Sequence, residues 1–133
     1  MVLFGGTGDL VKRKLLPALY NAFLDGNIDK MSRFICLGRG EMTSEQYIET
    51  CFEFATEAKN NVDHNAWNEF AKQIVYLRID ATKTETYANL LELIDQSRIN
   101  IFYLSTSPEL FKVICTNLAE LKLNHSLSRI VLE

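Results

Sequence analysis

The stretch Met1-Val2-Leu3-Phe4-Gly5-Gly6-Thr7-Gly8 decides the fold class of this chain. Its first four residues form an apolar run with the length of a short buried strand, and the run leads directly into a glycine-rich turn. After the turn, apolar residues recur at helical spacing, at Leu15, Leu16, Leu19, Tyr20, Phe23 and Leu24. Pro17 near the front of this segment and Gly26 just past its end are typical of helix boundaries. A strand, a tight turn and a helix in this order predict the first unit of an alternating α/β fold.

The same alternation continues along the chain. Further strands are predicted at residues 33–37, 75–79, 100–105 and 129–132. These strands are continuous apolar runs rather than alternating patterns, which is typical of a parallel sheet covered by helices on both faces. We therefore expect an α/β fold of the Rossmann type, with a doubly wound parallel sheet in a three-layer α/β/α arrangement and the strand order 3-2-1-4-5.

Capping residues mark the starts of the remaining helices. They are Thr43 with Gln46, Asp63, Thr82 with Glu85, and Ser107 before Pro108. The spacing of the two threonine pairs matches a capping box, in which each side chain accepts a hydrogen bond from the backbone amide of the other residue. The helix that begins at Thr43 is expected to run to about Lys59 and to be broken by Asn60-Asn61. The helix capped by Asp63 is expected to bury an apolar face made of Trp67, Phe70, Ala71 and Ile74.

Composition and charge argue against several classes of protein. The 133 residues are 47% hydrophobic and 23% charged, which are the proportions of a single globular domain. The net charge of −3 and the mixing of Lys and Arg with carboxylates disfavour nucleic acid or an acidic membrane as a partner. No apolar run approaches the roughly 20 residues that span a bilayer, and Met1 to Phe4 is too short for a signal peptide, so a cytoplasmic protein is expected.

The cysteines and histidines do not form a metal-binding or redox pattern. Cys36, Cys51 and Cys115 lie in apolar stretches without a C-x-x-C pair, so buried, reduced thiols are expected. His64 and His125 have no Cys, His or carboxylate at ligand spacing. Both are therefore expected to be surface residues, and no metal site is predicted.

Ligands of an open parallel sheet bind at the carboxyl ends of its strands, near the point where the strand order switches. The residues directly after the predicted strands are Gly5 to Asp9, Gly38-Arg39, Asp80-Ala81, Ser105-Thr106 and Glu133. In the first group, glycines let the backbone turn sharply and approach a diphosphate, whose charge the amides of the following helix start can meet. The spacing G-x-x-G is less specific than G-x-G-x-x-G, so a purely structural turn stays open as an alternative.

Arg39 stands where the second strand ends, a position that discriminates between nicotinamide cofactors. A carboxylate there bonds the ribose 2′-hydroxyl of NAD, whereas a guanidinium can bind the 2′-phosphate of NADP through two hydrogen bonds. The sequence therefore favours NADP over NAD. The alternative is an ordinary solvated arginine that balances Glu41. The cluster Lys12-Arg13-Lys14 is a second candidate site, because cations at a helix start oppose the helix dipole and favour an anionic ligand.

The segment from Gly5 to Leu19 is similar, nearly letter for letter, to the opening G-x-x-G-D-L-A-x-R-K-L-x-P-x-L of glucose-6-phosphate dehydrogenases of the bacterial type. The further matches cover the rest of the chain, and they are Asp25-Gly26, Gly38-Arg39, Phe102-Tyr103-Leu104 and Arg129-Ile130-Val131-Leu132-Glu133. The last of these resembles the start of the family's R-I-V-x-E-K-P-F-G segment. Two departures are Cys36, where the family often has Gly, and Ser107, which replaces the first of two prolines.

The resemblance implies oxidation of D-glucose 6-phosphate to 6-phosphogluconolactone by hydride transfer to NADP, in the pentose phosphate pathway. It implies that the NADP diphosphate is lined by Gly5, Gly6, Thr7, Gly8, Asp9 and Leu10. It also implies that Arg39 holds the 2′-phosphate, and that Asp80, Ala81 and Tyr103 flank the adenosine and nicotinamide ends. The family's catalytic histidine and substrate phosphate site belong to a segment that is not in this sequence, so no catalytic residue is assigned.

We therefore expect residues 1–133 to be the NADP-binding domain of a longer enzyme, cut after its fifth strand, because a domain seldom ends on a core strand. The complete enzyme is expected to be a homo-oligomer whose subunits contact one another through a separate catalytic domain. Alone, the chain is expected to bind NADP weakly without turnover. Two alternatives stay open, which are a stand-alone, non-catalytic NADP-sensing module and a structural α/β domain with an empty turn.

Overall fold

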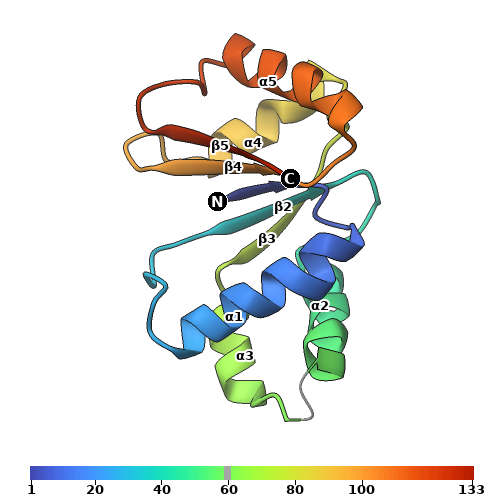
Figure 1. Cartoon of the computed structure of the whole chain (residues 1–133), viewed down its shortest axis with the longest axis vertical. Coiled ribbons are helices and arrows are strands. Elements are labelled where there is room, and N and C mark those ends of the chain that lie inside the picture. The colour runs from blue at the N-terminus through green and yellow to red at the C-terminus, as the bar shows by residue number, and fades with distance from the viewer. Residues whose placement is uncertain (59–60) are drawn as a thin grey trace.

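The computed structural model describes residues 1–58 and 61–133, which form one five-stranded sheet. The strands are β1 (Val2–Phe4), β2 (Phe34–Gly38), β3 (Ile74–Arg78), β4 (Asn100–Leu104) and β5 (Ser128–Leu132). All of them pair in parallel, in the order β3-β2-β1-β4-β5 (Figure 1). This arrangement confirms the predicted sheet and its strand order. The order reverses at β1, which places the switch point between the carboxyl ends of β1 and β4.

Helices cover both faces of the sheet and complete the three predicted layers. One face carries α1 (Leu16–Leu24), α2 (Ser44–Ala58) and α3 (His64–Ala71), and the other carries α4 (Ala88–Leu93) and α5 (Phe111–Glu120) (Figure 1). Successive strand side chains point to opposite faces, so the strands feed two apolar cores. Leu3 of β1 lies in the core under α1, α2 and α3, whereas its neighbour Phe4 lies in the core under α4 and α5.

A π-helical turn, η1 (Val11–Leu15), precedes α1 and was not predicted from the sequence. In it the amide of Leu16 donates to the carbonyl of Val11, five residues earlier. Pro17 follows at the start of α1. Proline has no N–H, and in a regular helix its ring would clash with the carbonyl four residues before it. The wider π-turn accommodates Pro17 without ending the helix, and turns of this kind are frequent near functional sites.

Two of the predicted helix caps are confirmed. The amide of Thr43 donates to Gln46 Oε1 at 2.9 Å, and the amide of Gln46 donates to Thr43 Oγ1 at 3.2 Å, which is the predicted capping box. Asp63 Oδ1 accepts from the amides of Asn65 at 2.8 Å and Ala66 at 3.4 Å. These bonds satisfy amides that have no acceptor within their helices.

The capping box predicted for Thr82 and Glu85 is wrong. The amide and the hydroxyl of Thr82 both donate to Asp80 Oδ1, at 3.0 Å and 2.7 Å. The side chain is therefore engaged in a turn directly after β3. The 3₁₀ turn η2 (Thr84–Tyr87) begins two residues later, and no side chain caps it.

The 3₁₀ turn η3 (Pro108–Leu110) begins after Ser107, with Pro108 at its first position, as predicted. The Ser107 side chain, however, forms no capping hydrogen bond, and only its backbone carbonyl accepts from the amide of Leu110. One further predicted boundary differs from the structure. Ile74 is the first residue of β3, not the end of a helix, although it does join the core that was predicted for it. The predicted helix end at Lys59 and break at Asn60 lie outside the described residues.

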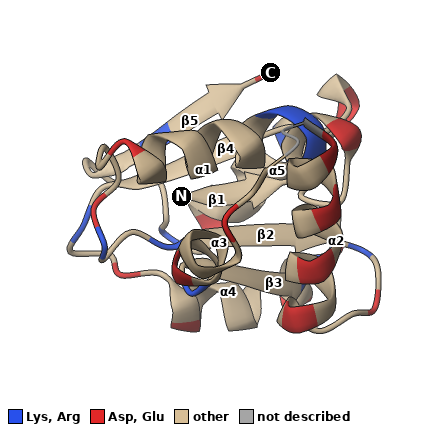
Figure 2. Ribbon diagram, turned by 90° about the horizontal axis from the view of Figure 1, so that it is seen from below, with Lys and Arg blue, Asp and Glu red and all other residues tan. Residues whose placement is uncertain are grey.

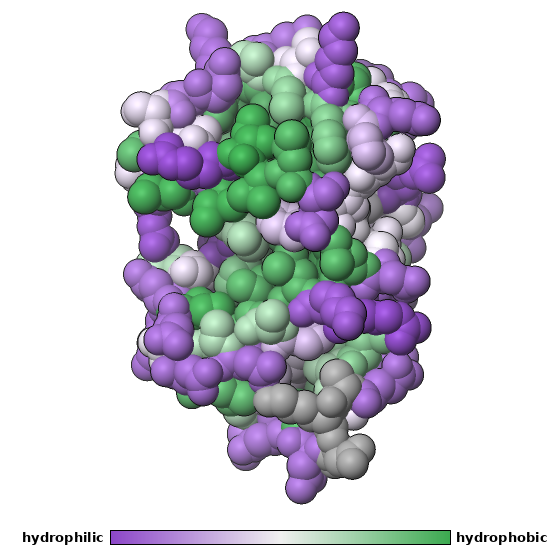
Figure 3. All heavy atoms as spheres, viewed as in Figure 1, coloured by the Kyte–Doolittle hydropathy of each residue, from purple (hydrophilic) through white to green (hydrophobic). Residues whose placement is uncertain are grey.

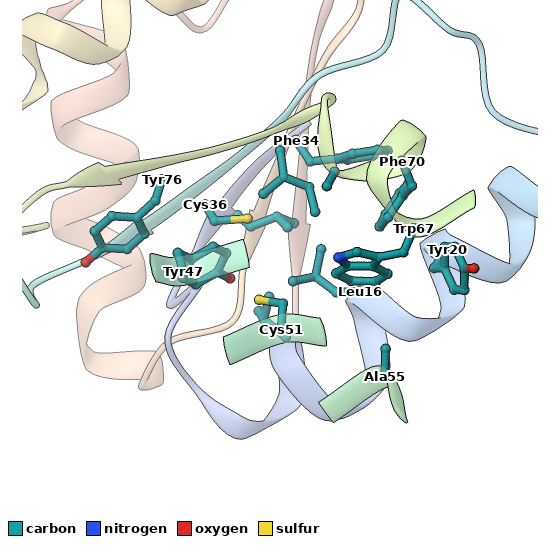
Figure 4. Close-up of a cluster of buried hydrophobic side chains, with 14 residues drawn as sticks. Leu16, Tyr20, Phe34, Cys36, Tyr47, Cys51, Ala55, Trp67, Phe70 and Tyr76 are labelled. Carbon is teal, nitrogen blue, oxygen red and sulfur yellow. The ribbon is translucent and has the colours of Figure 1, made fainter. Parts of the chain in front are cut away.

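Cys36 and Cys51 are fully buried and form no disulfide, and Cys115 is half-buried. The ring of Tyr47 lies beside the first two thiols in the core under α2 (Figure 4). Burial raises the pKa of Cys36 to about 12 and the pKa of Cys51 to about 11. Burial also raises the pKa of the Tyr47 hydroxyl. The core therefore contains two neutral, buried thiols, as predicted for Cys36 and Cys51, whereas the predicted burial of Cys115 is only partial.

His125 is not the surface residue that was predicted. Its Nδ1 accepts from the amide of Leu127 at 3.3 Å, while its Nε2 is buried without a partner among the described residues. His64 is exposed, as predicted, and its ring lies 4.8 Å from the ring of Phe52. Across residues 1–58 and 61–133, no group of three or more His, Cys, Asp or Glu side chains is placed to hold a metal ion.

Strand β5 is the least buried strand of the sheet. Among the described strands it pairs only with β4, so its outer edge has unpaired backbone groups. Its residues Ile130, Val131 and Leu132 are 43%, 37% and 56% exposed. Figure 3 shows apolar atoms gathered over this region of the surface.

In the part of the chain that the structure describes, no helix is both long and apolar enough to cross a bilayer.

We expect the free energy of unfolding to fall as the pH rises above about 9. The pKa values of Cys36 and Cys51 are higher in the fold than the ordinary value of 9.0, so their stabilisation is complete below pH 9 and is lost as the pH rises toward 11 and 12. Each thiol contributes a slope of about 1.4 kcal/mol per pH unit in that window. Urea unfolding at a series of pH values measures the slope, and a C36A/C51A variant with an equally steep slope would contradict the assignment.

Candidate functional site

The turn after β1 is fixed between two neighbouring strands. Gly5 has a φ of +78°, in the left-handed region that favours glycine. A Cβ at this position would lie 2.0 Å from the carbonyl oxygen of Ser105, directly after β4. On the other side, the amide of Gly6 donates to the carbonyl of Leu37 in β2 at 2.7 Å. The turn therefore occupies the switch point of the sheet, and position 5 accepts only glycine.

Gly8 closes this turn and begins the first helix. Its amide donates to the carbonyl of Gly5 at 2.9 Å, and its carbonyl accepts from the amide of Lys12 at 3.2 Å. Because the helical bonding begins there, the amides at Asp9 and Leu10 have no acceptor within the helix. These amides and the positive end of the helix dipole meet at the turn, which is an arrangement that suits a phosphate.

A pocket of about 310 Å³ opens at the carboxyl ends of β1, β2, β3 and β4. Six of the predicted site residues line it, and these are Gly5, Thr7, Gly8, Arg39, Asp80 and Ala81. Its other lining residues are Phe4, Leu37, Gly38, Ile79, Thr82, Ser105, Thr106 and Leu110. The structure thus brings the glycine turn and the arginine after β2 into one pocket.

The other four predicted site residues do not line this pocket. Asp9 and Leu10 lie at the helix start beside it, and Gly6 is buried behind it. The hydroxyl of Tyr103 donates to the carboxylate of Glu133, which raises the pKa of Tyr103. The contacts of Gly6 and Tyr103 are therefore with the protein itself, and their predicted cofactor contacts stay predictions.

Asp80 carries a carboxylate in the pocket, held by the turn after β3. The two hydrogen bonds from Thr82 are the main cause that lowers the pKa of Asp80, with smaller contributions from Lys83, 4.0 Å away, and from Arg39. The pattern D-x-T after a strand is typical of such a side-chain turn, and it could have identified Thr82 as a lining residue.

Arg39 is not the partner of Glu41. Glu41 pairs with Arg78 at 3.7 Å, and Arg78 Nε also donates to the backbone carbonyl of Arg39 at 3.2 Å. The side chain of Arg39 is exposed and forms no ion pair within residues 1–58 and 61–133. The structure therefore does not support the alternative that Arg39 balances Glu41, and it places Arg39 as an exposed residue in the lining of the pocket.

In the cluster Lys12-Arg13-Lys14, the side chains of Lys12 and Arg13 contact acidic or aromatic groups, and none of the three residues lines the pocket. Arg13 lies 3.5 Å from both Asp9 and Glu57, and its guanidinium stands 4.6 Å from the ring centre of Phe54. Figure 2 shows acidic segments along α2. Protein groups thus compensate Arg13, which weakens this cluster as a site for an anionic ligand.

A larger hollow of about 790 Å³ lies at the opposite end of the sheet, where the amino ends of the strands and Met1 meet. Ligands of open parallel sheets bind at the carboxyl ends, because the helix starts and the switch point lie there. The smaller pocket is therefore the candidate site.

The comparison with protein families agrees with this geometry. The model of the family described as "Glucose-6-phosphate dehydrogenase, NAD binding domain" matches residues 2–133. The chain belongs to this family. Family membership supports a site for a nicotinamide cofactor in this domain. The glycine turn lines the pocket in which such a site is expected.

Individual relatives are similar over the whole chain but are much longer. Glucose-6-phosphate 1-dehydrogenase of Dickeya dadantii is 34% identical over 135 residues, which cover 100% of this chain and 28% of the relative. The Helicobacter pylori (strain J99) protein of the same name is 34% identical, covering 100% of this chain and 30% of the relative. The crystal structure of glucose-6-phosphate 1-dehydrogenase from Mycobacterium avium matches with a TM-score of 0.91 at 27% identity, over 98% of this chain and 28% of that protein. The chain spans less than a third of these relatives.

We expect Gly5→Ala to destabilise the protein more than Gly26→Ala does. Both glycines have positive φ, and an alanine there costs about 1–2 kcal/mol from the backbone alone. At Gly26 a Cβ would meet no atom within 4 Å, whereas at Gly5 it would meet the Ser105 carbonyl. Urea denaturation of the two variants isolates the cost of that contact. Equal losses of unfolding free energy in the two variants would show that the Ser105 carbonyl does not obstruct a Cβ at position 5.

Proposed function

We propose that this chain is the NADP-binding domain of a glucose-6-phosphate dehydrogenase, the oxidoreductase that oxidises D-glucose 6-phosphate to 6-phosphogluconolactone in the pentose phosphate pathway. The observation that carries the proposal is the pocket that joins Gly5 and Gly8 to Arg39. Family membership over residues 2–133 supports the assignment of the cofactor class. NADP, when bound, supplies the acceptor for the hydride from the sugar.

The glycine turn is proposed to bind the diphosphate. The turn lies at the switch point, where Gly5 and Gly8 carry no side chain that would keep a ligand away from the backbone. The amides at the start of the first helix are hydrogen-bond donors, which a diphosphate needs. Thr7 adds a hydroxyl to the lining.

Arg39 is proposed to bind the 2′-phosphate that distinguishes NADP from NAD. It follows β2, where a carboxylate would instead favour the ribose hydroxyl of NAD. Asp80 lies one strand further out, and its charge is partly compensated by Thr82 and Lys83. Asp80 and Ala81 are proposed to flank the adenosine, where a carboxylate suits a hydrogen-bond donor such as the adenine amino group.

The residues that act on the sugar are proposed to belong to another part of the enzyme. Its partners are then the substrate glucose 6-phosphate and a second copy of the enzyme, bound through the catalytic domain. Tyr103 is proposed to approach the nicotinamide end from β4. A cytoplasmic location is proposed with this function. Reading the gene beyond the codon for Glu133 tests the domain assignment, because the family's K-P-[FL]-G segment is expected there and an immediate stop codon would favour a stand-alone module.

Isothermal titration with NADP and NAD tests the cofactor assignment. We expect the wild-type chain to bind NADP more tightly than NAD and to show no turnover of glucose 6-phosphate. A hydrogen bond to a charged group contributes about 1.5–3 kcal/mol, so Arg39→Ala is expected to weaken NADP binding about 10- to 100-fold and to leave NAD binding nearly unchanged.

The matched control is Arg33→Ala. Arg33 is an exposed arginine just before β2, at the opposite end of the same strand from Arg39, and it lines the hollow at the amino ends. This variant is expected to bind both cofactors as the wild type does. Absence of any binding by the wild type, or an equal loss of both cofactors in Arg39→Ala, would overturn the proposed role.

A further inference from the structure

Two tyrosine hydroxyls outside the pocket lining hydrogen-bond to the two backbone turns of the proposed cofactor site, one after β1 and one after β2. Tyr47 is fully buried, and its hydroxyl donates to the carbonyl of Gly6 in the glycine turn at 2.5 Å. Tyr76 is 6% exposed, and its hydroxyl donates to the carbonyl of Gly40, directly after Arg39, at 2.7 Å. Neither tyrosine lines the pocket.

The two tyrosines form one unit. Their rings are stacked, with centres 5.1 Å apart and planes inclined by 24° (Figure 4). Tyr47 comes from α2 and Tyr76 from β3, and the two elements are also joined at Ser44, whose Oγ accepts from the Tyr76 amide at 2.9 Å. Both side chains are therefore held by packing and by hydrogen bonds that do not depend on a ligand.

The Tyr76 hydroxyl stands where the turn that carries Arg39 leaves the sheet. A Cβ at Gly38 would lie 2.9 Å from this hydroxyl and 2.6 Å from Thr7 Cγ2, so the end of β2 passes tightly between Tyr76 and the glycine turn. The bond to Gly40 then fixes the backbone on the far side of Arg39. The Arg39 side chain itself is exposed, so these backbone contacts determine the point from which the side chain extends toward the pocket.

We propose that Tyr76 is a positioning residue for cofactor specificity, which holds the Arg39–Gly40 turn so that the guanidinium meets the 2′-phosphate, whereas Tyr47 positions the turn that serves every dinucleotide. This inference rests on the proposed function of the pocket. It assigns different consequences to the loss of the hydroxyl from each of the two stacked tyrosines. The Tyr76 hydroxyl affects only the cofactor with a 2′-phosphate, and the Tyr47 hydroxyl affects NADP and NAD alike.

The test is titration of NADP and NAD into the protein expressed from its complete reading frame, with Tyr76→Phe, Tyr47→Phe and Arg39→Ala. Each phenylalanine keeps the ring and its stacking and removes one oxygen. Tyr76→Phe is expected to raise the Kd for NADP about 3- to 10-fold and to leave the Kd for NAD unchanged, as the loss of one hydrogen bond would do. Tyr47→Phe is expected to raise both Kd values by the same factor.

The double variant Arg39→Ala with Tyr76→Phe shows whether Tyr76 acts through Arg39. If it does, Tyr76→Phe changes the NADP affinity of the wild type but not that of Arg39→Ala. The control is Tyr20→Phe, which removes a hydroxyl from the same core and is expected to change neither Kd, since Tyr20 lies beside Trp67 and away from Tyr47 and Tyr76 (Figure 4). Thermal unfolding of every variant confirms that each is folded at the temperature of the titration.

The outcomes separate the two proposals. A wild type that prefers NADP, with an Arg39→Ala variant that does not, supports the cofactor assignment whatever the tyrosines do. In that case an equal loss of NADP and NAD in Tyr76→Phe, or a further loss in the double variant, overturns the positioning role. A wild type without preference for NADP overturns the cofactor assignment itself.

Discussion

The approach of the Gly5 backbone to the carbonyl of Ser105 is the constraint on which the rest of the site depends. It exists because β1 is the central strand, with β2 and β4 paired in parallel on its two sides. The turn after β1 passes close to the ends of both neighbouring strands, and only glycine permits the required φ at this distance. The turn, the helix start and the pocket all follow from that exit.

Tyr47 belongs both to the core and to the site. Its ring packs in the core beside Cys36 and Cys51, and its hydroxyl donates to the Gly6 carbonyl. A buried hydroxyl and carbonyl that satisfy each other stabilise the fold, since either left alone would cost about 1–3 kcal/mol. The rigidity of the turn therefore comes from the packing of α2 against the sheet and does not need a ligand.

The sequence predicted the features that depend on local pattern and missed those that depend on contacts across the fold. Buried strands, the Thr43 box and the Arg39 position are visible in spacing alone. The π-turn before Pro17 was missed because it depends on how the backbone accommodates Pro17 within a continuing helix. Thr82 was misassigned because a threonine hydroxyl can bond either to a helix start or to a nearby carboxylate, and here it bonds to Asp80. The bond from Tyr47 to Gly6 joins residues 41 positions apart, and no periodicity predicts it.

Strand β5 gives the sheet an asymmetry in local stability. Strand β1 is hydrogen-bonded on both edges and buried on both faces, whereas β5 is bonded on one edge and leaves apolar side chains in solvent. Regions with few buried contacts open at a lower free energy than the core. Amide protons of β5 should therefore exchange with solvent through small local fluctuations, while those of β1 should exchange only when the whole sheet unfolds.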